Sequence, residues 1–112
     1  MKATAKMIKT SVQKLNEVVN LIRNKDTEYA LYQLRFCSRR SVSREIMKVL
    51  NSAIANSENN HGADIEKLVI DKVLIGKSVS LSRTRFRARG RVNKIIKPYS
   101  RVTILLKEEA RI

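Results

Sequence analysis

The sequence predicts an α+β fold, in which three helices pack on a small antiparallel sheet that carries a long protruding β-hairpin arm. Two observations predict this class, a change of apolar period after Ala63 and a basic stretch between two strand segments. Up to Ala63 the apolar residues recur at helical spacing, and beyond it they alternate with polar residues or gather in β-branched runs, as in strands. Between the two strand segments lies a basic stretch, residues 76–97, which we interpret as the arm. A length of 112 residues fits a single domain, 1–112.

The first two helices are expected early in the chain. The first ten residues form a short basic strand or arm, and Thr10-Ser-Val-Gln13 has the form of a capping box. Apolar residues then follow at helical spacing as far as Ile22, which predicts a helix over about 11–24. Residues 24–26 break it, and a shorter helix begins near Thr27.

The third helix has the clearest pattern. Val42, Ile46, Val49 and Ala53 share one face, and Arg40, Arg44 and Lys48 follow one another at every fourth position on the opposite side. A solvated face is the ordinary explanation of such a basic stripe. The basic character of the rest of the chain also makes it a candidate binding surface. Residues 56–62 (NSENNHG) are polar and end on glycine, which predicts the helix terminus and a loop.

Two strands are expected in the second half, one beginning near Leu68 and the other containing the alternating segment that ends at Leu106. Pro98 cannot donate to a central ladder, so it suits an edge or a bulge. The apolar positions of helices and strands together predict the core, namely Leu15, Val19, Ile22, Ile46, Val49, Leu50, Ala53, Ile54, Val73, Ile104 and Leu106.

The charge balance restricts the function. There are 24 Lys+Arg against 10 Asp+Glu, a formal net charge of +14, so a polyanion such as nucleic acid, an anionic membrane surface or an acidic polysaccharide is the expected partner. No apolar run is long enough to span a membrane. Cys37 is the single cysteine and His61 the single histidine, so we expect no disulfide, no metal site, no cofactor, no small-molecule substrate and no enzyme activity.

The arm carries the most specific pattern. No acidic residue occurs between Asp71 and Glu108, and five arginines lie at every second position from Arg83 to Arg91. On an extended chain they would repeat at roughly 6.6 Å, about the step between phosphates, and the guanidinium fork grips phosphate oxygens. A disordered basic tail is the alternative, but strand sequence flanks the segment on both sides. The candidate RNA-binding residues are Lys6, Lys9, Lys14, Arg40, Arg44, Lys48, Lys77, Arg83, Arg85, Arg87, Arg89, Arg91, Lys94, Lys97 and Arg101.

The aromatic residues do not form the paired stacking platform of an RNA-recognition sheet. Tyr29, Tyr32 and Phe36 are expected to be packing residues of the second helix, whereas Phe86, between two arginines, could equally stack on a base. We expect Cys37 to be a small buried or half-buried hydrophobe, and His61 to be a loop residue or an RNA contact.

Four stretches of sequence carry a resemblance to a known family. They are SAIANSENN at 52–60 with GAD at 62–64, RARGR at 87–91, SRVTILL at 100–106, and Ser11-x-x-Lys14 with LIR at 21–23. Together, in this order and spacing, they resemble the bacterial form of the universal large-subunit ribosomal protein family numbered twenty-two. The match covers nearly the whole chain, although Phe86 stands where many members have a proline.

The resemblance implies a structural protein of the cytoplasmic ribosome that binds large-subunit ribosomal RNA and supports assembly. Its domain would lie near the tunnel exit, with the hairpin threaded inward to line the polypeptide exit tunnel. Neighbouring large-subunit proteins and the nascent peptide would be further partners, with no membrane. Carried onto this sequence, the tunnel tip would comprise Ser82, Arg83, Thr84, Arg85 and Phe86.

Two other classes of protein remain as alternatives. A DNA-compacting protein could use a β-arm in the minor groove, but such arms usually carry an apolar wedge, which is not evident here. An RNA-modifying enzyme would need a cofactor loop or a catalytic constellation, and Gly62, Gly76 and Gly90 are the only glycines. Co-sedimentation with ribosomal subunits or with DNA would distinguish them.

Overall fold

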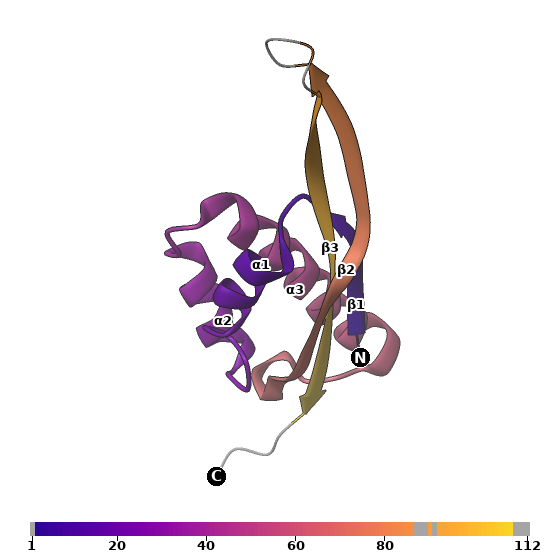
Figure 1. Ribbon diagram of the computed structural model, residues 1–112. Coiled ribbons are helices and arrows are strands. Elements are labelled where there is room, and N and C mark those ends of the chain that lie inside the picture. The colour runs from indigo at the N-terminus through magenta and orange to yellow at the C-terminus, as the bar shows by residue number, and fades with distance from the viewer. Residues whose placement is uncertain (1, 87–89, 91, 109–112) are drawn as a thin grey trace.

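The computed structural model describes residues 2–86, 90 and 92–108, with side chains omitted at 79, 81–86 and 92–96. Within these residues the α+β prediction is confirmed, since three α-helices pack on a three-stranded antiparallel sheet (Figure 1). In chain order the elements are β1 (Lys2–Ile8), α1 (Val12–Val19), α2 (Thr27–Arg35), α3 (Arg40–His61), the short 3₁₀ helix η1 (Ile65–Lys67), β2 (Leu68–Phe86) and β3 (Val92–Glu108).

The sheet has the strand order β1-β3-β2. β1 pairs with β3 from Lys2↔Leu105 to Ile8↔Ser100, whereas β2 pairs with β3 along its whole length, as far as Phe86↔Val92. The part of β3 that precedes Ser100 therefore pairs with β2 alone, and this two-stranded ribbon projects past the helices (Figure 1). The molecule is accordingly elongated, with extents of 68 × 27 × 16 Å.

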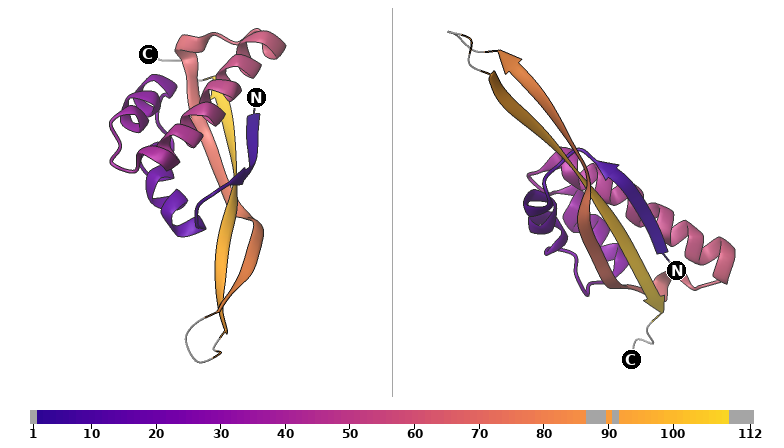
Figure 2. Two further views of the ribbon diagram at one scale, coloured as in Figure 1. Left: turned by 90° about the horizontal axis from the view of Figure 1, so that it is seen from above. Right: turned by 45° about the vertical axis from the view of Figure 1, so that its right-hand side comes forward.

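All three helices lie on one face of the sheet (Figure 2). α3 lies against β1 and β3, α1 contacts β2, and α2 packs chiefly on α3. Alternate residues of β3, namely Val102, Ile104 and Leu106, point into this layer and are buried. The predicted core residues are all buried except Ile54, which is partly buried and packs against the core.

Two bulges adapt β2 to this arrangement. The register with β3 shifts between Ile70 and Lys72, so the buried positions change from Leu68 and Ile70 to Val73. A second shift lies between Lys77 and Ser80, and Ser80 is paired with Pro98. Pro98 thus lies where β1 no longer pairs with β3 and next to a bulge, which agrees with its expected edge or bulge position.

The first helix differs from its expected bounds. Ser11, not Thr10, is the N-cap, and its hydroxyl accepts a hydrogen bond from the Lys14 amide at 3.4 Å. α1 ends at Val19 rather than near residue 24, because the chain continues in tighter turns until Asn24, which has a positive φ of 59°. Ile22 is nevertheless fully buried, so the apolar spacing extends beyond the helix.

The expected loop at residues 56–62 is wrong, because α3 continues to His61. Ser57 is fully buried and donates its hydroxyl to the Ala53 carbonyl at 2.8 Å, while Asn56 donates its amide to the Lys2 carbonyl at 3.1 Å. The polar run therefore forms the last turns of the helix. Gly62 ends α3 in the left-handed conformation, with φ at 61°.

Candidate nucleic-acid interface

The sequence-predicted cations whose side chains are described lie at the surface. Lys97 is half-buried. The others are exposed, namely Lys6, Lys9, Lys14, Arg40, Arg44, Lys48, Lys77 and Arg101. Arg83, Arg85 and Lys94 have described backbones within β2 and β3. The remaining candidates, Arg87, Arg89 and Arg91, lie outside the described residues.

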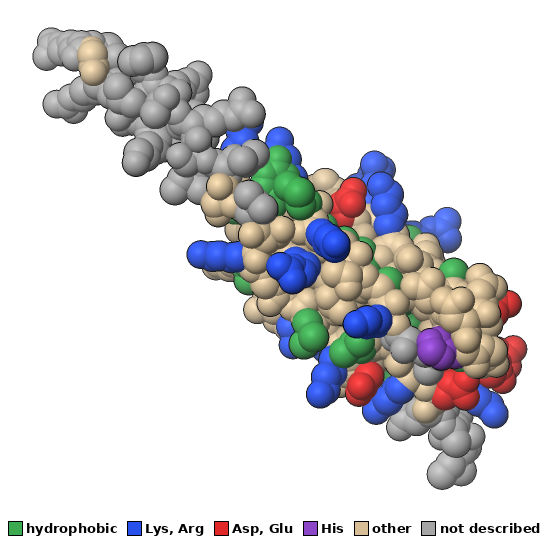
Figure 3. Space-filling model, turned by 90° about the vertical axis from the view of Figure 1, so that its right-hand side faces the viewer, with side chains coloured by type: hydrophobic (Ala, Val, Ile, Leu, Met, Phe, Trp, Pro, Cys, Tyr) green, Lys and Arg blue, Asp and Glu red, His purple; other side chains and the backbone are tan. Residues whose placement is uncertain are grey.

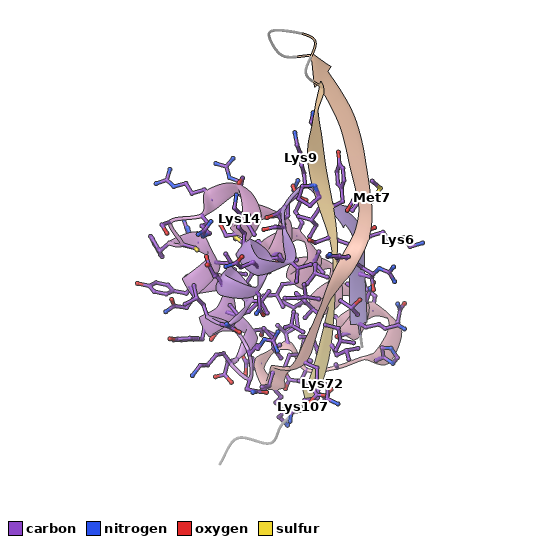
Figure 4. The ribbon with its side chains drawn as sticks, in the orientation of Figure 1. Lys6, Met7, Lys9, Lys14, Lys72 and Lys107 are labelled. Carbon is purple, nitrogen blue, oxygen red and sulfur yellow. The ribbon has the colours of Figure 1, made fainter. Side chains whose placement is uncertain are left out.

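Some of these cations meet in a hollow where the arm leaves the globular part, which we call the arm-base pocket. Figure 4 shows Lys9 and Lys14 on the side of the helical layer from which the arm projects. The pocket has a volume of about 490 Å³ and is lined by Lys9, Thr10, Ser11, Lys14, Ser38, Arg39, Arg40, Ser41, Val42, Lys97 and Pro98. Three segments far apart in the sequence form it: the β1–α1 turn, the beginning of α3 and the base of the arm.

The arm-base pocket is strongly positive. Five of its lining residues are Lys or Arg, and its described lining includes no carboxylate. Arg39 is paired with Glu17 at 2.7 Å. The other four cations have no ion pair within the described part of the chain. The pocket therefore concentrates uncompensated positive charge that an anionic ligand would neutralise.

Hydroxyl and amide donors accompany the charge. The hydroxyl residues of the lining are Ser11, Ser38 and Ser41. The first three residues of α3, Arg40, Ser41 and Val42, also line the pocket. No side chain caps α3, and its first turn contains no acidic residue. The first amides of a helix lack carbonyl partners within it, so this end of α3 offers donors to a ligand.

The basic stripe along α3 does not form one uniform surface. Arg40 lines the arm-base pocket, and it also borders a second hollow that contains Arg35 and Arg44. Lys48, in contrast, lies 3.5 Å from the Glu45 carboxylate. The stripe therefore contributes its charge mainly at the end of α3 nearest the arm.

Sequence reasoning missed several residues of the pocket, notably Thr10, Ser38, Arg39 and Ser41. The sequence pattern indicates Thr10 only as a helix cap. The available signal was SRRS at 38–41, in which two hydroxyl residues flank two arginines directly before an apolar helical pattern. Such a run at a helix start is typical of an anion-binding segment.

The prediction that Tyr29, Tyr32 and Phe36 are packing residues is wrong. They are 46%, 61% and 68% exposed, and the Tyr32 and Phe36 rings contact each other with centroids 4.9 Å apart. The reason is the orientation of α2, whose buried side carries Ala30 and Leu34. The aromatic residues lie on the opposite side of the helix.

The other candidate residues have simpler positions. Cys37 is half-buried and packs against the core, as expected, whereas His61 is exposed and helical rather than in a loop. On the face shown in Figure 3, several acidic side chains lie near the histidine, at the end of the molecule away from the arm. Within the described residues no cluster of His, Cys, Asp and Glu could hold a metal ion, and no helix is long and apolar enough to cross a membrane.

A basic pocket at the root of a basic two-stranded arm defines a class of small protein suited to binding a polyanion. The sequence comparisons identify the family. The model of the family described as Ribosomal protein L22p/L17e matches residues 3–107, and the chain belongs to this family.

Its curated relatives carry the name large ribosomal subunit protein uL22. The relative from Maricaulis maris is 52% identical over 107 residues, which cover 96% of this chain and 84% of the relative. The one from Rhodospirillum rubrum is 49% identical with the same coverage. The one from Wolbachia pipientis is 48% identical over 106 residues, 95% of this chain and 90% of the relative. The chain is therefore a structural constituent of the large ribosomal subunit and not an enzyme.

Proposed function

We propose that this chain binds large-subunit ribosomal RNA through its arm-base pocket and its arm, and that the arm lines the polypeptide exit tunnel. The observation that carries the RNA-binding proposal is the meeting of four cations without ion pairs, from three separate segments, in a lining without carboxylates. Phosphate contacts supply most of the affinity of such surfaces and fix the position of the protein on the nucleic acid.

The dimensions of the arm support the tunnel role. β2 extends nine residues beyond Lys77, as far as Phe86, and from Ser80 onward it is paired with β3. At the rise of a strand this length is roughly 30 Å. From Lys72 to Lys107 the sequence contains no acidic residue. An arm of this length and charge can pass between RNA segments, because the phosphates on both sides supply its counter-charge.

The proposed partners follow from this placement. Ribosomal RNA would surround the arm and the arm-base pocket, with neighbouring large-subunit proteins beside the domain, in the cytoplasmic ribosome. The tip, Ser82 to Phe86, would face the nascent peptide. Arg87, Arg89 and Arg91 would supply counter-charge to the RNA wall and so support assembly.

Two arm variants test the roles of reach and charge. Deleting Arg83–Phe86 together with Val92–Ile95 removes four matched pairs, because Arg83 pairs with Ile95 and Phe86 with Val92. The arm shortens by roughly 13 Å without a change of register. The matched control keeps the full length and substitutes the same three cations, Arg83→Gln, Arg85→Gln and Lys94→Gln.

We expect the shortened arm to be incorporated into subunits but to alter the tunnel bore and the response to tunnel-binding antibiotics. The charge-matched control should retain the bore. Subunit profiles, antibiotic sensitivity and the structure of the particle are the readouts. An unaltered bore in the shortened variant would exclude the tunnel role. Failure of the native protein to co-sediment with large subunits after a moderate salt wash would contradict ribosomal RNA binding itself.

A further inference from the structure

We propose that the arm-base pocket is a specific site for one phosphate group of the RNA backbone, and that this phosphate ties the base of the arm to the helical layer. The inference rests on the proposed RNA-binding function and adds the ligand and its position. It differs from general attraction to a polyanion because the site would use neutral donors of fixed geometry as well as charge.

The buried hydroxyl of Thr10 is the first observation. Thr10 lines the pocket and is only 7% exposed, yet its Oγ1 has no hydrogen-bond partner among the described residues. The backbone groups of Thr10 are both satisfied, since its amide donates to the Ile8 carbonyl at 2.8 Å and its carbonyl accepts from Ser100 at 2.7 Å. A buried polar atom without a partner is unfavourable. The atom is closed to solvent in the free chain, so a phosphate oxygen would accept its proton only after a local shift of the side chains around Thr10.

The uncapped beginning of α3 is the second, independent observation. Its first three residues line the same pocket, with neither a capping side chain nor an acidic residue in the first turn. α1, whose first turn lies nearby, is instead capped by Ser11. Free amides and the positive end of the helix dipole favour a phosphate at this position.

The cations that line the site come from three segments of the chain. Lys9 and Lys14 come from the β1–α1 segment, Arg40 from α3 and Lys97 from the arm. A phosphate bound among them would contact both the helical layer and the arm. The hollow formed by Arg23, Asn24, Asp71, Lys72, Val73 and Leu74 provides a contrast. It contains the carboxylate of Asp71, which Lys107 approaches at 3.7 Å, so it is less suited to an anion.

The test measures binding of inorganic phosphate to the full chain by calorimetry and by the chemical shifts of backbone amides, at constant ionic strength against chloride. We expect saturable binding of one equivalent, with shifts at Ser41 and Val42. Arg40→Gln should weaken it by about tenfold or more, because a charge-assisted hydrogen bond is lost. Lys67→Gln removes the same charge from an exposed residue outside the pocket and should leave the affinity unchanged.

Thr10→Val tests the neutral donor. Valine has nearly the shape of threonine, so the free protein should lose no stability, whereas phosphate affinity should fall. With ribosomal RNA, Arg40→Gln should reduce the log–log salt slope by roughly 0.7–0.9, while Thr10→Val should weaken binding without changing the slope.

Absence of saturable phosphate binding, or an equal loss in Arg40→Gln and Lys67→Gln, would overturn the phosphate site. If the unsubstituted chain still bound RNA, the proposal of ribosomal RNA binding would stand and only the phosphate site would be refuted. Loss of RNA binding in the unsubstituted chain would instead refute the function on which the inference rests.

Discussion

The Ser100 hydroxyl donates a hydrogen bond to the Thr10 carbonyl at 2.7 Å, and both residues are buried. They are ninety positions apart in the sequence. Ser100 lies where β1 stops pairing with β3, opposite Ile8, and Thr10 lies in the turn that leads into α1. This hydrogen bond therefore links the turn at Thr10, which lines the arm-base pocket, to β3, a strand that also forms the arm.

Removing this bond should destabilise the domain. Ser100→Ala leaves the buried Thr10 carbonyl without its donor, and we expect the free energy of unfolding to fall by about 1–3 kcal/mol. Thr103→Val is the control on the same strand, because its hydroxyl makes only an exposed bond with Thr4. It should change stability by no more than about 0.5 kcal/mol. Urea unfolding followed by circular dichroism measures both, and equal losses would contradict the role of Ser100.

Gly62 and Gly76 should respond oppositely to alanine. Gly62 ends α3 with φ at +61°, a conformation unfavourable for residues with a Cβ, so Gly62→Ala should cost about 1–2 kcal/mol. Gly76 lies in β2 without a positive φ, and no atom would lie within 4 Å of an added Cβ. Gly76→Ala should therefore be neutral or stabilise by up to about 1 kcal/mol. Thermal unfolding of both variants tests the difference, and a larger loss at Gly76 would contradict it.

The contact between α3 and the sheet should account for much of the stability. Ile46 is fully buried on the inner side of α3, and Ile46→Ala should lower the free energy of unfolding by about 2–5 kcal/mol through lost burial and a residual cavity. Ile54→Ala is the matched control on the same helix, because Ile54 is only partly buried. Its loss should be clearly smaller in the same denaturant titration. The reverse order would show that the inner side of α3 has been assigned incorrectly.

RNA binding should weaken steeply with salt, since each phosphate neutralised releases condensed counterions. Each contact should add roughly 0.9 to the log–log slope for duplex RNA and about 0.7 for single strands. The double variant Lys9→Gln, Lys14→Gln should lower the slope by about 1.4–1.8 if both side chains contact phosphates. Filter binding at several salt concentrations provides the slopes. Binding that does not change with salt would exclude an electrostatic interface.

The sequence by itself determined the elements, most of the core and the positive character of the surface. These properties depend on local spacing, because positions such as Ile46, Val49 and Ala53 share a side of any helix that contains them. The same holds for the alternation of Val102, Ile104 and Leu106 in β3. Net charge needs no fold at all, and the family motifs are read directly from the chain.

Only the tertiary structure decided which local tendencies prevail and which distant residues meet. α3 continues past Asn56, where Ser57 is buried and the side-chain amide of Asn56 donates to the carbonyl of Lys2, a partner that local spacing does not reveal. Tyr32 is exposed because the packing of Leu34 fixes the rotation of α2. The arm-base pocket exists because antiparallel pairing and helix packing bring Lys9, Arg40 and Lys97 to one place. Contacts between residues so far apart depend on the whole chain, so periodicity within any one segment could not predict them.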